Sequence, residues 1–139
     1  TEFLSHNPVL QELRLVDTQF VGTSLATVSE GLSKSSSIQR LYLVNNDLGP
    51  QDATHLNKIL ISSNQSLQEL CICENQLADA GLVTLCQGLN ENTGLYKLDL
   101  RSNSIQVEGA LALQEVLKTS KNITTLSLAN NELGNVGSE

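Results

Sequence analysis

The sequence predicts a single α/β domain built from five copies of one unit, each a β-strand followed by an α-helix. Two observations support this. Four columns of Leu, Ile or Phe recur at shifts of 28 or 29 residues along the 139-residue chain. Within each unit, the apolar spacing then changes from the alternation of a strand to the three- and four-residue steps of a helix. The units begin at residues 10, 38, 67, 95 and 123, the last being truncated, and residues 1–9 precede them.

The strand is expected in the first half of each unit, where apolar and polar residues alternate. In the first unit Leu13 and Leu15 are separated by Arg14, which is the period of a half-buried strand. All twenty positions of the four columns are apolar: Leu10, Leu13, Leu15, Phe20; Ile38, Leu41, Leu43, Leu48; Leu67, Leu70, Ile72, Leu77; Leu95, Leu98, Leu100, Ile105; and Ile123, Leu126, Leu128, Leu133.

A polar column follows each strand, where the chain must turn. It contains Thr18, Asn46, Asn75, Asn103 and Asn131. A buried Asn can bond backbone groups of its own turn and of the neighbouring turn, so the stacked side chains should form a ladder. Thr18 can satisfy fewer partners, and the first turn should be the least well held.

The helix is expected in the second half of each unit. Its stripe of apolar residues comprises Leu25, Val28, Leu32; Ala53, Leu56, Leu60; Leu82, Leu85, Leu89; and Ala110, Leu113, Leu117. Gly49 and Pro50 suit the start of the second helix. Ser24, Gly81 and Gly109 are small enough to let a helix start lie close to its neighbour, and Asp52 is the exception in this column.

The pattern Leu-x-x-Leu-x-Leu-x-x-Asn-x-Leu followed by a full helix resembles the ribonuclease-inhibitor type of leucine-rich repeat, and the resemblance covers essentially the whole chain. It implies a right-handed solenoid, with parallel strands on the concave face and helices on the convex face. Residues 1–9 resemble the end of an earlier repeat, and residues 134–139 begin a convex segment. Because uncapped solenoid ends expose apolar core, we expect further repeats or another domain to cap them.

Composition excludes several classes of function. The net charge of −7 argues against nucleic-acid binding and against an anionic membrane surface. No apolar run approaches the roughly 18 residues of a membrane span. The three cysteines are an odd number, which favours a reducing compartment and a cytoplasmic location. The chain does not begin with Met, and we expect it to be part of a longer protein.

The candidate binding site is the concave strand face, where variable side chains stand on a rigid frame. Its mixed charge, with one Tyr and three Arg, suits a protein partner. The competing interpretation is that these side chains only solvate the strands and pair with one another. The candidate residues are Arg14, Val16, Arg40, Tyr42, Val44, Cys71, Cys73, Lys97, Asp99, Arg101 and Ser127.

No cofactor, metal or catalytic site is expected. Cys71 and Cys73 are two residues apart on one strand, a geometry that disfavours a disulfide between them, and no His is near enough to complete a zinc site. Cys86 should be half-packed on its helix. Glu69, Glu74 and Asp99 could approach one another, but an open face with basic neighbours keeps them ionised.

These observations predict a non-catalytic protein that recognises other proteins through its concave face. The resemblance suggests a larger intracellular receptor or regulator, such as the NOD-like receptors of innate immunity. Two alternatives remain. One is a GTPase-activating module of the Ran type, for which no residue of this sequence can be assigned, and the other is a structural spacer or scaffold in a large assembly.

Overall fold

The computed structural model of the chain describes residues 10–19, 22–61 and 66–132. The strands are β1 (Glu12–Val16), β2 (Arg40–Val44), β3 (Glu69–Cys71), β4 (Lys97–Asp99) and β5 (Thr125–Ser127). The helices are α2 (Gly22–Ser33), α3 (Ala53–Ile61), α4 (Ala78–Glu91) and α5 (Val107–Thr119), and a 3₁₀ turn, η1 (Pro50–Asp52), leads into α3. The predicted strand–helix alternation is confirmed throughout this part of the chain.

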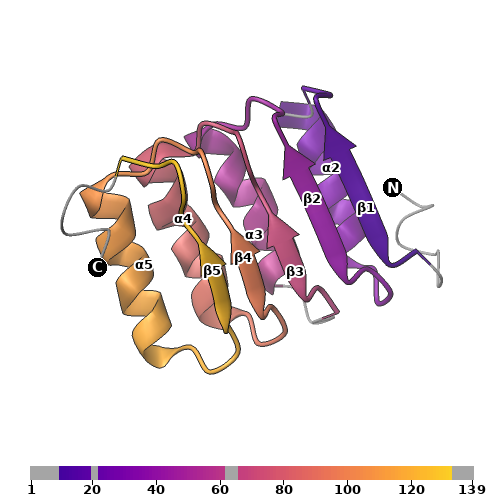
Figure 1. Cartoon of the computed structure of the whole chain (residues 1–139). Coiled ribbons are helices and arrows are strands. Elements are labelled where there is room, and N and C mark those ends of the chain that lie inside the picture. Colours follow the sequence, from indigo (N-terminus) through magenta and orange to yellow (C-terminus); the bar gives the residue numbers. More distant parts are fainter. Residues whose placement is uncertain (1–9, 20–21, 62–65, 133–139) are drawn as a thin grey trace.

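The five strands form one parallel sheet in chain order, which is the arrangement of a solenoid (Figure 1). The register places one leucine column straight across the sheet, since Leu13 pairs with Leu41, Leu41 with Leu70, Leu70 with Leu98 and Leu98 with Leu126. The 28- and 29-residue spacing of the sequence is therefore the distance along the chain between neighbouring strands. Each connection between parallel strands carries a helix, as such crossovers require.

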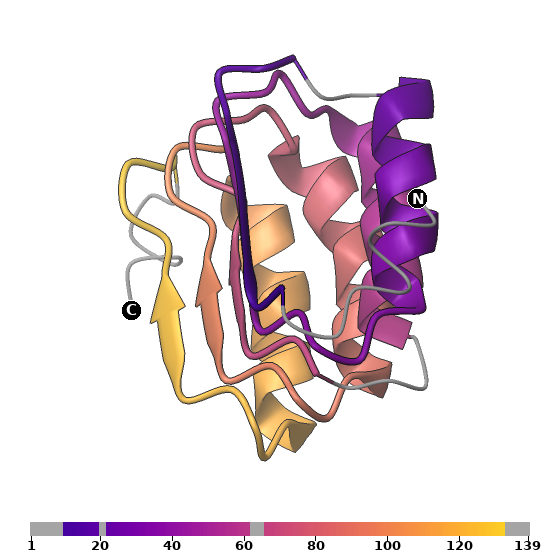
Figure 2. The same cartoon turned by 90° about the vertical axis from the view of Figure 1, so that its right-hand side faces the viewer.

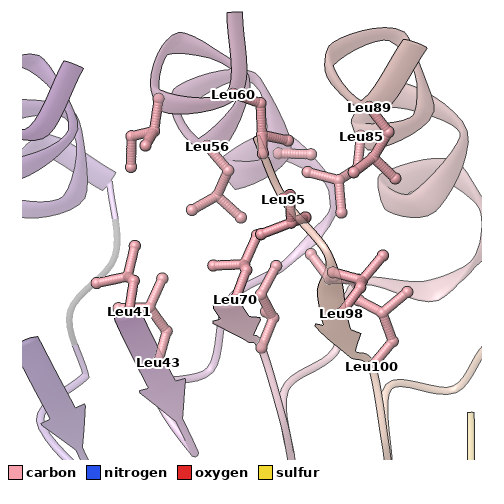
Figure 3. Close-up of a cluster of buried hydrophobic side chains, with 14 of the residues drawn as sticks. Leu41, Leu43, Leu56, Leu60, Leu70, Leu85, Leu89, Leu95, Leu98 and Leu100 are labelled. Atoms are coloured by element: carbon pink, nitrogen blue, oxygen red, sulfur yellow. The ribbon is translucent and has the colours of Figure 1, made fainter. Parts of the chain in front are cut away.

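The molecule has two layers, because all four helices cover the same face of the sheet (Figure 2). The core lies between them, where side chains such as Leu41 and Leu70 from the strands meet Leu56 and Leu85 from the helices (Figure 3). All four of these leucines are 2% exposed or less. The other face of the sheet has no covering layer in the described residues, and we call it the open sheet face.

The predicted asparagine ladder is present. The Nδ2 of Asn75 donates to the carbonyl oxygens of Leu43 at 2.8 Å and of Cys73 at 2.9 Å. Its Oδ1 accepts the backbone N–H of Asn46 at 2.9 Å and that of Leu48 at 3.1 Å. One side chain therefore joins its own turn to the preceding one, and Asn46, Asn103 and Asn131 repeat this bonding.

Thr18 takes part in the ladder with less capacity. Its N–H donates to Oδ1 of Asn46 at 3.0 Å and its hydroxyl donates to the same oxygen at 2.5 Å. Because Thr has no amide group, it cannot donate two further bonds to carbonyl oxygens as the asparagines do.

The helix starts pack closely at the glycines of the predicted small-residue column. A Cβ on Gly81 would lie 3.1 Å from the backbone Cα of Pro50, and one on Gly109 would lie 2.5 Å from Oδ1 of Asp79. Asp52, the exception in the column, is buried because it bonds backbone groups. Its two carboxylate oxygens accept the N–H groups of Gly22 at 3.1 Å and Gly49 at 2.9 Å.

Two packing predictions were wrong. Leu117 was assigned to the buried stripe of its helix, but it is 37% exposed because no further helix covers that side of α5 in the described residues. Cys86 was expected to be half-packed and is buried on α4. The predictions for residues 1–9 and 134–139 lie outside the described residues. Among those that are described, no helix has the length and apolar character needed to cross a membrane.

Candidate functional site

The open sheet face carries a shallow hollow of about 360 Å³ over the middle strands. The sequence places the polar strand residues of the hollow at alternate positions, so that they project away from the leucine core, and the core residue Leu70 also contributes to the lining. Eight of the eleven candidate residues line it: Arg14, Tyr42, Val44, Cys71, Cys73, Lys97, Asp99 and Arg101. Val16, Arg40 and Ser127 do not line it.

A cluster of Arg, Glu and Tyr on β1 and β2 lies beside the hollow, and its members Arg14 and Tyr42 line it. Glu12 accepts bonds from Nε of Arg14 at 2.8 Å and from Nε of Arg40 at 2.9 Å. These bonds, with that from Arg14 the stronger, hold the pKa of the Glu12 carboxyl below its usual value. The Arg14 guanidinium also lies 4.2 Å from the centre of the Tyr42 ring, within the range of a cation–π contact.

The other side contains two ion pairs on β3 and β4 and the turn after β4. Nε of Arg101 lies 2.9 Å from Oδ1 and 3.0 Å from Oδ2 of Asp99, and this bonding raises the pKa of the guanidinium. Nζ of Lys97 lies 3.8 Å from Oε1 of Glu69, whose Oε2 accepts the hydroxyl of Tyr96 at 3.2 Å. The charges are thus held in place by cross-strand and near-neighbour pairing, as the competing interpretation of this face expected.

The prediction for Cys71 and Cys73 was wrong, because the structure joins them in a disulfide. In a regular strand, Cα atoms two residues apart would be about 6.7 Å apart with parallel side chains. Here β3 ends at Cys71, and the Cα atoms of the pair are 5.6 Å apart, within the usual range for a disulfide. Cys86 is the free cysteine, and burial raises the pKa of its thiol to about 11.

Four polar residues complete the hollow and were absent from the eleven candidates: Glu69, Glu74, Ser102 and Asn130. The last three belong to a rim where the backbone adopts φ between 57° and 59°. At this rim the N–H of Glu74 donates to the carbonyl of Arg101 at 2.9 Å, and that of Ser102 donates to Ala129 at 3.1 Å. The repeat pattern already places Glu74, Ser102 and Asn130 immediately beyond the strands, at the rim of the concave face.

The hollow has little of the geometry that catalysis requires. Glu69, Glu74 and Asp99 do come together there, as expected, but two of the three are already ion-paired. Donor atoms of Cys71, Cys73 and Asp99 lie within 4.8 Å of one another, a grouping that was not predicted from the sequence. His55 lies on α3, in the layer across the sheet from the hollow, and cannot serve the sulfur atoms as a base.

Comparison with known proteins agrees with this architecture. The Leucine Rich repeat family matches residues 63–86, 91–113 and 119–139. The ribonuclease inhibitor of Sus scrofa is 33% identical over 136 residues, which are 96% of this chain and 30% of the inhibitor. The chain is built of leucine-rich repeats of the ribonuclease-inhibitor type.

Other proteins with similar repeats are named for different roles. The NACHT, LRR and PYD domains-containing protein 3 of Rattus norvegicus is 35% identical over 96% of this chain. A protein phosphatase 1 regulatory subunit 37 homolog of Caenorhabditis briggsae is 33% identical over 84% of it. The chain spans 13% of the length of each of these two relatives.

Solved structures show the same fold at low sequence identity. The actin-binding site 2 of leiomodin-1 superposes with a TM-score of 0.84 at 16% identity, covering 98% of this chain and 79% of that one. The C-terminal domain of a Caenorhabditis elegans tropomodulin gives 0.80 at 14% identity, covering 92% of this chain and 78% of that one. These leucine-rich repeats therefore share their architecture with proteins whose sequences are only 14% and 16% identical to this chain.

Proposed function

We propose that the leucine-rich repeats of this chain bind a protein partner through the open sheet face, without catalysis. The observation that carries the proposal is the hollow over β1 to β4, where three cations and three anions stand around Tyr42, Val44 and the Cys71–Cys73 pair. Arg and Tyr are the residue types most often found at the energetic centre of protein interfaces.

The ordering of these side chains supports binding in a second way. Arg14 is held by Glu12 and the Tyr42 ring, and Arg101 is held by both oxygens of Asp99. Side chains that are already fixed lose less rotamer entropy when a partner docks. The balanced charge would supply specificity, because a partner with misplaced like charges would be rejected.

The names of the relatives support a binding role over an enzymatic one. One is a regulatory subunit of protein phosphatase 1 and another is an inhibitor of ribonuclease, so both names describe an action on another protein. We infer a comparable role for the longer protein to which these repeats would belong. In that protein, further repeats or another domain would pack on the ends of this stack of repeats. Exposed Leu117 on α5 marks one place where such packing would bury apolar surface.

We further propose that this protein acts in the cytoplasm. The resemblance to intracellular leucine-rich-repeat proteins supports this location. The number of cysteines supports this location less than the sequence alone suggests, because two of the three are joined in a disulfide in the structure.

The test is affinity capture from a cell extract with the wild-type chain and two matched charge reversals. Arg101→Glu reverses an exposed cation on the open sheet face, and Lys118→Glu reverses another exposed cation on α5. Each of these cations is paired with a nearby acid on its own element or turn, at 2.9 Å for Arg101–Asp99 and 3.0 Å for Lys118–Glu115. We expect Arg101→Glu, and separately Tyr42→Ala, to lose partners that Lys118→Glu retains.

The result that would overturn the proposal is a set of partners lost with Lys118→Glu but kept by both sheet-face variants. That pattern would favour a structural spacer that is contacted through its helices. Circular dichroism of each variant must show retained helix content, so that a loss of binding reports the surface and not the fold.

A further inference from the structure

The Cys71–Cys73 disulfide links residues that are already neighbours. Sequence separation between the two is only 2, so the bond closes a very short loop. A disulfide restricts the unfolded chain less as the loop becomes shorter. The leucine core and the asparagine ladder connect distant segments independently of this bond. The bond therefore contributes little to the stability of the fold.

The bond also lies in the wall of the hollow on the open sheet face, where only a small fraction of either cysteine reaches the surface. Cys71 and Cys73 are 7% and 4% exposed, and both line the hollow on the open sheet face. The side chains around them include Arg101, Lys97 and Arg14, which are paired with Asp99, Glu69 and Glu12 respectively. Glu69, Glu74 and Asp99 face the same hollow, and two of them are neutralised by Lys97 and Arg101.

The remaining cysteine cannot interfere with this pair. Cys86 is buried on α4, and burial raises the pKa of its thiol to about 11. Helix α4 lies in the helix layer on one face of the sheet (Figure 2), and the residues of the hollow lie on the open sheet face. Disulfide reshuffling onto Cys86 is therefore blocked in the folded chain, and the pair behaves as an isolated two-electron couple.

We propose that Cys71 and Cys73 form a reversible thiol–disulfide exchange site on the open sheet face, whose co-reactants are low-molecular-weight thiols of the glutathione class and their disulfides. The inference does not depend on the proposed protein binding. In the reducing direction, one thiolate attacks a protein sulfur, the Cys71–Cys73 bond breaks, and the released protein thiolate takes a proton from water. A second thiolate attacks the small-molecule sulfur of the mixed disulfide, the bond between that sulfur and the protein sulfur breaks, the small disulfide leaves, and the second protein thiolate also takes a proton from water. Two small thiols are oxidised and one protein disulfide is reduced.

A metal site made of the same atoms is the weaker alternative. The two thiolates of a reduced pair and the Asp99 carboxylate could together bind a thiophilic ion such as Zn²⁺. However, both carboxylate oxygens already accept from Nε of Arg101, at 2.9 Å and 3.0 Å, and this guanidinium would lie close to the added cation. The geometry favours sulfur exchange over metal binding.

The test is equilibration of the native chain in buffers of reduced and oxidised glutathione at several ratios, followed by acid quenching, alkylation and mass spectrometry. We expect one reversible transition between a form with no alkylated thiol at the pair and a form with two. Cys86→Ala provides the background in which every counted thiol belongs to the pair. The wild-type chain, alkylated while still folded, should give the same number of alkylated thiols, since buried Cys86 should react slowly.

Tyrosine fluorescence gives a second reading at the site. The register pairs Tyr42 directly with Cys71, the chain has no Trp, and the other tyrosine, Tyr96, does not line the hollow. A disulfide quenches a neighbouring tyrosine, so reduction should increase emission, and Tyr42→Phe should abolish the increase while the mass transition persists.

Three results would overturn the proposal. The first is a pair that stays bonded in excess reduced glutathione until the chain is unfolded, which would make it a buried structural link. The second is a pair that stays as two thiols in excess oxidised glutathione. The third is protection of both thiols of the reduced chain by Zn²⁺ with no disulfide formed on its removal under oxidising buffer, which would indicate a metal site.

Discussion

The fourth and fifth strands carry the same leucine column, yet their leucines have different surroundings. Leu98 on β4 is fully buried between β3 and β5, whereas its register partner Leu126 on β5 is only half-buried. The helices repeat the contrast, since Leu89 on α4 is 2% exposed and Leu117 on α5 is 37% exposed. The residue type is unchanged, so burial in this fold is a property of the neighbouring unit. Stability should then be a sum of contacts between adjacent repeats.

The leucine pair gives the largest test of this comparison. Leu98→Ala should lower the free energy of unfolding by about 2–5 kcal/mol, because it removes buried contacts and leaves a cavity. Leu126→Ala should cost less than about 2 kcal/mol, because its site is partly open to water. Urea denaturation followed by circular dichroism measures both. Equal losses for the two variants would contradict a nearest-neighbour account of the stack.

The asparagine ladder gives a smaller test of the same contrast. Nδ2 of Asn103 donates to the carbonyl of Ile72 at 2.5 Å and to that of Leu100 at 3.2 Å, and the residue is fully buried. Asn103→Ala should cost about 1–3 kcal/mol, since these carbonyls would lose their partner without gaining water. Asn131 is half-buried, and water can replace part of its bonding.

The matched variant for this test is therefore Asn131→Ala, which should be the milder of the two by urea denaturation. A loss for Asn131→Ala that equals or exceeds that for Asn103→Ala would mean that bonding to the turn, and not burial, decides the contribution. Both variants should keep the parallel sheet, because the ladder lies beyond the strand ends.

Periodicity was enough to predict the repeated architecture, since each leucine column has one chemical type and one environment. It could not predict features that depend on a single contact between units. The carboxylate of Asp52 occupies a position that holds glycine in two other repeats, and only the placement of the N–H groups of Gly22 and Gly49 explains it. The disulfide was missed for a similar reason, because the geometry expected for Cys71 and Cys73 was that of an uninterrupted strand, and β3 ends at the first of them.

The binding face was predicted in outline for a different reason. Alternation fixes which side chains leave the core, so Arg14, Tyr42 and Arg101 could be placed on the open sheet face from sequence. Which of the eleven candidates meet in one hollow depends on side-chain pairing across strands. Arg40 turns to Glu12 on β1, and it does not line the hollow.

The difference in burial between inner and outer repeats can also be tested at a single helix position. Ser29, Asn57 and Cys86 occupy it on α2, α3 and α4 and are all buried, while Gln114 occupies it on α5 and is exposed. Burial raises the pKa of the Cys86 thiol from 9.0 to about 11. The raised pKa means that the folded state favours the neutral thiol, so this contribution to stability is complete below pH 9 and is lost as the pH rises from 9 to 11.

We expect the loss to be about 1 kcal/mol at pH 10, measured as the difference in unfolding free energy between pH 8 and pH 10 relative to Cys86→Ala, in which the other titrating groups are unchanged. The matched control adds Gln114→Cys to the Cys86→Ala variant, which moves the thiol to the equivalent exposed position. A thiol there should ionise equally well in the folded and unfolded chain and should add no pH dependence. If the two thiols gave the same dependence, the raised pKa of Cys86 could not come from the covering helix, and the contrast between inner and outer repeats would fail at this position.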